Sequence, residues 1–200
     1  MKKLFVYLSL ALISLGIVVV FWKQELVYNL PTPQPCNYKP VEVGQALVIP
    51  YNIEKKNKPL FLHFFNPECP CSRFNIKHFK ALIRDYGKQV DFKVVIQSTD
   101  STLSADEIKD EFDLDVECIL DRDKKIANSC GVYSTPQAVL TDVTGNLYYR
   151  GNYNKARYCT NKTSDFAQIA IDSLLKNSNK PIFSALATRP YGCTLPTCDK

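Results

Sequence analysis

The first residues of the chain stand apart from the rest by their hydrophobic pattern. Residues 4–22 carry no charge, and lysines flank this run at positions 2, 3 and 23. A helix rises about 1.5 Å per residue, so the run is about 28 Å long, close to the hydrocarbon thickness of a bilayer. No small residues suited to signal-peptidase cleavage follow it. We therefore predict that residues 1–23 are an uncleaved transmembrane anchor with its N-terminus in the cytoplasm.

Two stretches, 24–45 and 178–200, show neither helical nor alternating periodicity. The first contains four prolines, which is typical of a semi-stiff stalk. The second contains three prolines and two cysteines, so something must pin it if it is ordered. Between them, residues 46–177 have the patterning of a globular domain. The sequence thus predicts an anchor, a stalk, one domain and a cysteine-containing C-terminal tail.

The domain is organised around a short apolar run and the helix that follows it. Residues 60–65 are apolar and aromatic apart from His63, which predicts a strand buried on both faces. Residues 72–86 have apolar positions at helical spacing. Cys69 and Cys71 lie between the two, where the N–H groups of a helix N-terminus favour a thiolate over a thiol. A strand, a cysteine pair and a helix in this order predict a redox site.

The remaining pattern alternates strands and helices, which indicates an α/β sandwich. Ser104 and Glu107 have the spacing of a capping box. The expected elements are a strand at 91–97, a helix at 104–112, a short strand at 117–121, a helical turn at 123–129, a hairpin formed by 136–142 and 147–151, and a last helix at 164–176.

Charge excludes one class of partner. The chain has 25 basic and 20 acidic residues, and three of the basic ones flank the apolar N-terminal run, which leaves the rest at +2. No basic tract stands out, so we expect no nucleic-acid partner.

Three segments together resemble the thioredoxin superfamily, and most closely its membrane-anchored TlpA-like or redoxin-like branch. They are 65–70, 121–132 and 135–151, and the resemblance covers roughly residues 45–177. It implies a three-layer α/β sandwich, thiol–disulfide exchange without a cofactor or metal, and a cis proline at Pro136. The Thr135-Pro136 pair would present backbone groups to a substrate chain.

The resemblance also implies roles at the cysteine pair. Cys69 would be the attacking thiolate and Cys71 its resolving or buried partner. His63 lies six residues before Cys69, where thioredoxins that resemble this chain often place a buried acid, so it would relay protons near neutral pH. Members commonly have two residues between the cysteines, but here Pro70 stands alone. Closing so small a ring requires a bend and favours an oxidising pair; otherwise Cys69 acts alone and a distant cysteine resolves it.

Six further cysteines lie in a compartment that permits disulfides, and they allow 15 full pairings. We expect a structural bridge between Cys159 and Cys193, because it would pin the tail; a tail cysteine that resolves Cys69 is the functional alternative. Cys118 is expected to be a small apolar residue. Cys130 lies a few residues before the expected cis proline. A further alternative is that it lies close enough to Cys69 to take part in exchange.

The predicted function is therefore a single-pass membrane protein whose domain lies in the periplasm or another extracytoplasmic space. Its partners would be exported cysteine-containing proteins, a membrane redox partner and the bilayer. Two alternatives stay open. One is a Cu(I) metallochaperone resembling the Sco group, although that group has more widely spaced cysteines and a late histidine that this chain lacks. The other is a thioredoxin-fold binding module without catalysis.

Overall fold

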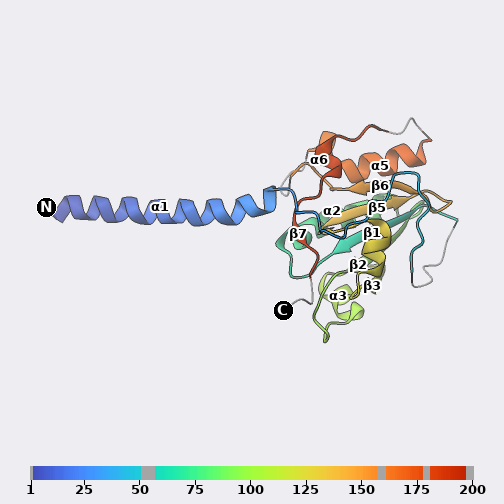
Figure 1. Ribbon diagram of the computed structural model, residues 1–200, viewed down its shortest axis with the longest axis horizontal. Helices are drawn as coiled ribbons and strands as arrows, with labels where there is room; N and C mark the ends of the chain where they lie inside the picture. The colour runs from blue at the N-terminus through green and yellow to red at the C-terminus, as the bar shows by residue number, and fades with distance from the viewer. Residues whose placement is uncertain (1, 51–56, 157–160, 178–180, 197–200) are drawn as a thin grey trace.

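A long helix precedes the folded domain in the computed structural model, which describes residues 2–50, 57–156, 161–177 and 181–196. Helix α1 (Lys2–Asn29) continues past the predicted end of the anchor at residue 23. Its part from Lys3 to Lys23 is long and apolar enough to cross a membrane. Figure 1 shows α1 extending away from the rest of the chain. The predicted N-terminal transmembrane helix is consistent with this element.

A five-stranded mixed sheet forms the centre of the domain, with the order β3-β2-β1-β5-β6. Its strands are β1 (Leu60–Phe65), β2 (Asp91–Ile96), β3 (Glu117–Leu120), β5 (Gln137–Thr141) and β6 (Leu147–Gly151). The first three are parallel, and β5 and β6 continue the sheet in antiparallel pairing. The central position of β1 explains its apolar sequence, since it is covered on both faces.

Side chains of β1 alternate between two cores. Phe61 and Phe65 point to the larger core, which also receives α2 (Pro70–Tyr86), α3 (Ala105–Glu111) and α5 (Phe166–Leu175). Leu62 and Phe64 point to the opposite core, which α4 (Lys125–Cys130) covers. The three-layer α/β sandwich that the sequence predicts is confirmed (Figure 1).

Local signals set the helix boundaries. The capping box of Ser104 and Glu107 is present at the start of α3. Asp165 caps α5, and a short 3-10 helix, Lys162–Ser164, precedes it. Asp121 is buried just after β3 and accepts hydrogen bonds from the Ile126 and Ala127 N–H groups, both at 2.9 Å. This one carboxylate therefore satisfies two N–H groups in the first turn of α4.

The N-terminal segment that the sequence presents as a stalk lies against the domain. Pro31 forms a β-bridge with Tyr191. The Arg150 guanidinium donates to the Val41 carbonyl at 3.0 Å and to the Cys130 carbonyl at 3.1 Å. These contacts use backbone groups and isolated side chains, which leave no periodic pattern in a proline-rich sequence.

The tail also packs on the domain over the described residues 181–196. It contains α6 (Ala185–Thr188) and the short strand β7 (Cys193–Thr194). Strand β7 pairs in antiparallel fashion with β4 (Ser134–Thr135), and the two form a separate small sheet. The segment that follows α1 thus meets the tail, because the bridge of Pro31 to Tyr191 lies next to this sheet.

Replacement of Asp121 by alanine should lower the free energy of unfolding by about 2–3 kcal/mol, because it leaves buried N–H groups without an acceptor. The side chain of Gln97, whose Nε2 donates to Asp121 at 2.8 Å, would lose its acceptor as well. Asp121→Asn keeps one acceptor oxygen and should lose less. Chemical denaturation of the two variants measures the difference; equal losses would contradict this account of α4.

Candidate active site

The candidate site lies where β1 passes into α2. The Asn66 side-chain oxygen accepts from the Glu68 N–H at 2.8 Å, and the Asn66 carbonyl accepts from the Cys69 N–H at 3.1 Å. The Ser72 hydroxyl accepts from the Asn66 N–H at 3.3 Å. This turn makes Cys69 the N-cap of α2, with Pro70 in the first turn, where its missing N–H costs nothing.

Cys69 is disulfide-bonded to Cys193, with 6.1 Å between their Cα atoms and 124 residues between them in sequence. The predicted bridge from Cys193 to Cys159 is therefore wrong; Cys159 itself lies outside the described residues. The reason is the pairing of β4 with β7, which places Cys193 opposite Thr135. The Thr135 carbonyl oxygen lies 3.6 Å from the Cys69 sulphur, so the same strand pairing brings the two cysteines together.

Cys71 completes a triad with the bridged pair. It lies in the first turn of α2, its side chain is only 2% exposed, and it carries a thiol outside the bridge. The sulphur atoms of Cys69, Cys71 and Cys193 all lie within 4.8 Å of one another. A third sulphur at this distance can reach the disulfide with a small side-chain movement.

The Thr135-Pro136 peptide bond is cis, as the resemblance to thioredoxins implied. Thr135 and the neighbouring Ser134 are both fully buried. The Ser134 hydroxyl lies within hydrogen-bonding distance of the Thr32 hydroxyl, the Tyr191 carbonyl and the Cys193 carbonyl, at 2.8, 3.3 and 3.2 Å. One buried hydroxyl therefore links β4 to both the N-terminal segment and the tail.

His63 is fully buried on the face of β1 that α2 covers. Its ring stacks on Phe79 with 4.3 Å between centroids, and its Nδ1 forms a 2.7 Å hydrogen bond with the Tyr153 hydroxyl. Burial, followed by repulsion from His78, lowers the pKa of His63 to about 3, whereas the sequence suggested an ordinary value. Burial also raises the pKa of Tyr153 well above its usual value. Both partners are neutral at neutral pH, and the relay role of His63 stays a prediction.

Two other cysteines are kept as thiols by burial. Burial raises the pKa of Cys130 to about 12 and that of Cys118 to about 11. Cys130 packs in the core that α4 covers, and within the described part of the chain it does not belong to the triad. The raised pKa of Cys118 is consistent with the prediction that it is a small apolar residue. Participation of Cys130 in exchange stays a prediction.

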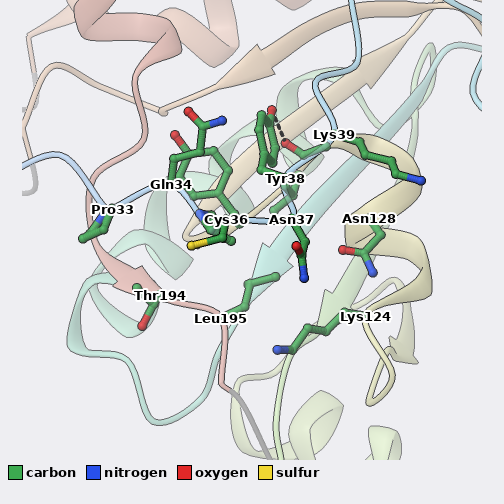
Figure 2. Close-up of a pocket in the computed structure, with 14 residues that line it drawn as sticks. Pro33, Gln34, Cys36, Asn37, Tyr38, Lys39, Lys124, Asn128, Thr194 and Leu195 are labelled. Atoms are coloured by element: carbon green, nitrogen blue, oxygen red, sulfur yellow. Dashed lines mark hydrogen bonds between the residues drawn. The ribbon is translucent and has the colours of Figure 1, made fainter. Parts of the chain in front are cut away.

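A pocket of about 650 Å³ adjoins the tail strand. Figure 2 shows that the N-terminal segment, α4 and the tail provide its walls, with Thr194 and Leu195 on the tail side. Tyr38 fixes the N-terminal wall, because its hydroxyl donates to the Gly131 carbonyl at 3.1 Å. The sequence contains no sign of this pocket, and it indicates the pairing of a tail cysteine with Cys69 only as the alternative, because both depend on contacts between segments about 60 residues or more apart.

The sheet order, the cysteine motif after the central strand and the cis proline beside it define a thioredoxin-like protein. The chain belongs to the family of the domain of unknown function DUF6436, whose model matches residues 41–197. No curated protein sequence matches the chain.

Solved structures agree on the fold. A hypothetical protein from Sinorhizobium meliloti aligns with a TM-score of 0.65 and 15% identity over 79% of this chain and 96% of its own. An uncharacterized conserved protein from Geobacillus kaustophilus aligns with a TM-score of 0.64 and 19% identity, over 84% of this chain and 100% of its own. The thioredoxin domain of a thiol-disulfide oxidoreductase from Bacteroides vulgatus aligns with a TM-score of 0.51 and 12% identity, over 68% of this chain and 99% of its own.

Acid should destabilise the protein through His63. Its pKa is about 3 when folded and near 6.5 when unfolded, so the unfolded state binds the proton first as pH falls. The free energy of unfolding should decrease between about pH 6.5 and pH 3 by up to about 1.4 kcal/mol per pH unit from this group. His63→Leu should remove that contribution, while Tyr153→Phe, which keeps the imidazole, should retain it. Denaturation curves across this range test the point, and an unchanged slope in His63→Leu would contradict the buried neutral imidazole.

Proposed function

We propose that the protein is a membrane-tethered thiol–disulfide oxidoreductase that exchanges disulfides with cysteine-containing proteins outside the cytoplasm. The observation that carries this proposal is the disulfide of Cys69 with the Cys71 sulphur less than 4.8 Å away. A disulfide beside a third thiol is the arrangement that exchange requires, because the reaction passes through attack of a thiolate on a disulfide sulphur.

The position of Cys69 suits the role of attacking residue. It caps a 17-residue helix that has no acidic residue in its first turn, and the positive end of the helix dipole stabilises a thiolate there. Arg73, in the first turns of α2, pairs with Glu111 at 3.4 Å and lies over the Phe112 ring. The helix N-terminus is therefore the electrostatic feature that favours the Cys69 thiolate.

The exchange balances as two displacements. A dithiol reductant, the proposed membrane redox partner, first reduces the Cys69–Cys193 disulfide and leaves two thiols on the protein. The Cys69 thiolate then attacks a client disulfide, forms a mixed disulfide with one client sulphur, and releases the other as a thiolate. The Cys71 thiolate then attacks the Cys69 sulphur, forms a Cys69–Cys71 disulfide, and releases the first client sulphur as a thiolate that takes up a proton. The client is reduced and the protein oxidised by two electrons; the reverse sequence oxidises a client. A membrane redox partner would reset the pair.

The remaining residues of the site take supporting roles in this proposal. Thr135 and Pro136 present backbone groups to the client chain, next to the Cys69 sulphur. His63 would receive the Cys71 proton only transiently, because a pKa of about 3 disfavours its charged form at neutral pH.

The membrane topology follows from α1. Lys2 and Lys3 precede the apolar span, and positive charges favour the cytoplasmic side. The domain would therefore lie in the periplasm or another extracytoplasmic space, where disulfides persist and exported proteins are the available clients.

Cys69→Ser should reduce the rate of exchange with glutathione disulfide by about 100-fold or more, because it removes the nucleophile. Peptide mapping of the glutathionylated cysteines measures this rate. In the reduced chain, Cys71→Ser combined with Cys193→Ser should instead accumulate the mixed disulfide at Cys69, because both neighbouring sulphur atoms that could displace it are absent. Cys36→Ser is the matched control, since Cys36 is exposed and lies outside the triad. Full exchange activity in Cys69→Ser would refute the proposal.

A second function is favoured by the triad itself. After reduction, three sulphur atoms within 4.8 Å would suit a soft cation such as Cu(I), and Cys193 supplies the third ligand that the cysteine pair alone lacks. In that case copper would be the cargo of a metallochaperone.

Cu(I) titration of the reduced full chain against a chromogenic chelator separates the two functions. Binding through the triad should give one equivalent of Cu(I), and Cys193→Ser should weaken it by about tenfold or more, while Cys130→Ser should not. Copper-independent exchange through Cys69 supports the oxidoreductase. Tight copper binding without any exchange would make the metallochaperone the better account.

A further inference from the structure

The C-terminal tail lies where a thioredoxin-like site would receive a client chain. We propose that residues 190–195 are a built-in client segment, and that their site along β4 selects cysteine segments with glycine before the cysteine and an apolar residue two positions after it. This inference rests on the proposed function and names the substrate class of the same site: extended cysteine-containing segments of exported proteins.

Backbone contacts hold the tail as an added strand. Thr194 pairs with Ser134 and Cys193 with Thr135 in antiparallel register. The Leu195 N–H donates to the Tyr133 carbonyl at 3.4 Å. On the other side of the tail, the Thr32 N–H donates to the Pro190 carbonyl at 2.9 Å. Contacts of this kind accept any extended chain, so selection has to come from the positions around the cysteine.

The position before the cysteine admits only glycine. Gly192 has a φ of +119°, in the region that side-chain-bearing residues rarely adopt. A Cβ atom on Gly192 would lie 2.3 Å from the Thr135 carbonyl oxygen, which is backbone and cannot swing aside. The backbone conformation and the lack of space for a Cβ atom therefore both require glycine at this position.

The position two residues after the cysteine is apolar. Leu195 is only 8% exposed and packs in the core that α4 covers, together with Val132 and Leu47. It also contributes to the wall of the pocket in Figure 2. A polar side chain here would lose this burial, so the site discriminates against it.

The triad allows the Cys69–Cys193 disulfide to break, which would release the tail segment. If the Cys71 thiolate attacks the Cys69 sulphur, a Cys69–Cys71 disulfide forms and Cys193 departs as a thiolate that takes up a proton. A purely structural bridge between Cys69 and Cys193 would not need a third sulphur within 4.8 Å. Because the tail is tethered, its effective concentration is high, and an external client must compete with it.

Synthetic peptides test the selection. The full chain carries Cys71→Ser and Cys193→Ser, so Cys69 is the one triad residue that can react. The peptide has the sequence of residues 189–196, capped at both ends, with its cysteine as a mixed disulfide with thionitrobenzoate. Attack by Cys69 on the peptide sulphur joins the peptide to Cys69 and releases thionitrobenzoate. Peptide mapping at Cys69 excludes reaction at the other cysteines.

A methyl group added at the glycine should have opposite effects on the reaction rate, depending on whether it is added to the peptide or to Gly192 of the protein. Replacing the peptide glycine by alanine should slow reaction at Cys69 by about tenfold, and replacing its leucine by asparagine should do the same. Gly192→Ala in the protein should speed reaction with the unmodified peptide by about tenfold, because it expels the resident segment. Leu186→Ala, at an exposed position of the tail, is the matched control and should change nothing.

Equal rates for the three peptides at Cys69 would overturn this inference and leave the proposed function standing. Failure of Cys69 to react with any peptide or with glutathione disulfide would overturn the proposed function itself. If the double variant does not fold, the reduced wild-type chain serves, with the order of the three peptide rates at Cys69 as the deciding result.

Discussion

The antiparallel pairing of Ser134 and Thr135 with Thr194 and Cys193 is the interaction on which the site depends. It holds the tail against the strand that precedes the cis proline, and it thereby places the Cys193 sulphur at the N-terminus of α2. The buried Ser134 hydroxyl extends the same contact to Thr32, close to the end of α1. The segment after α1 and the C-terminal tail are thus held together at one point, next to Cys69.

Burial separates reactive from inert groups in this molecule. For Cys118 and Cys130, desolvation outweighs the opposing effects of Lys109 and Arg150, so their pKa values rise and they remain thiols at neutral pH. His63 is desolvated too, and its pKa falls, so the centre of the sheet carries no charge from it at neutral pH. Cys69 differs because it is the N-cap of α2, at the positive end of the helix dipole. Of the cysteines in the described part of the chain, Cys69 therefore has the environment that best suits a reactive thiol, as the proposed function requires.

The short-range predictions were accurate for the same physical reason throughout. The strand at 60–65, the helix after it and the capping box at Ser104 each arise from patterns within about fifteen residues, and the structure confirms them. The bridge of Cys193 was predicted wrongly because the choice among cysteines follows spatial distance, and distance between residues 69 and 193 depends on how a two-residue strand pairs. So short a strand has no periodicity to detect.

By itself, the sequence determined the apolar N-terminal span, the α/β order, the central strand and the placement of Cys69 and Cys71 at a helix start. These follow from hydrophobic spacing and capping chemistry, which act locally along the chain. Only the tertiary structure decided that Cys193 joins this pair, that the proline-rich segment after the helix belongs to the domain, and that His63 is neutral. Each of these depends on desolvation or on pairing between segments tens to more than a hundred residues apart, and neither property is encoded in a local pattern.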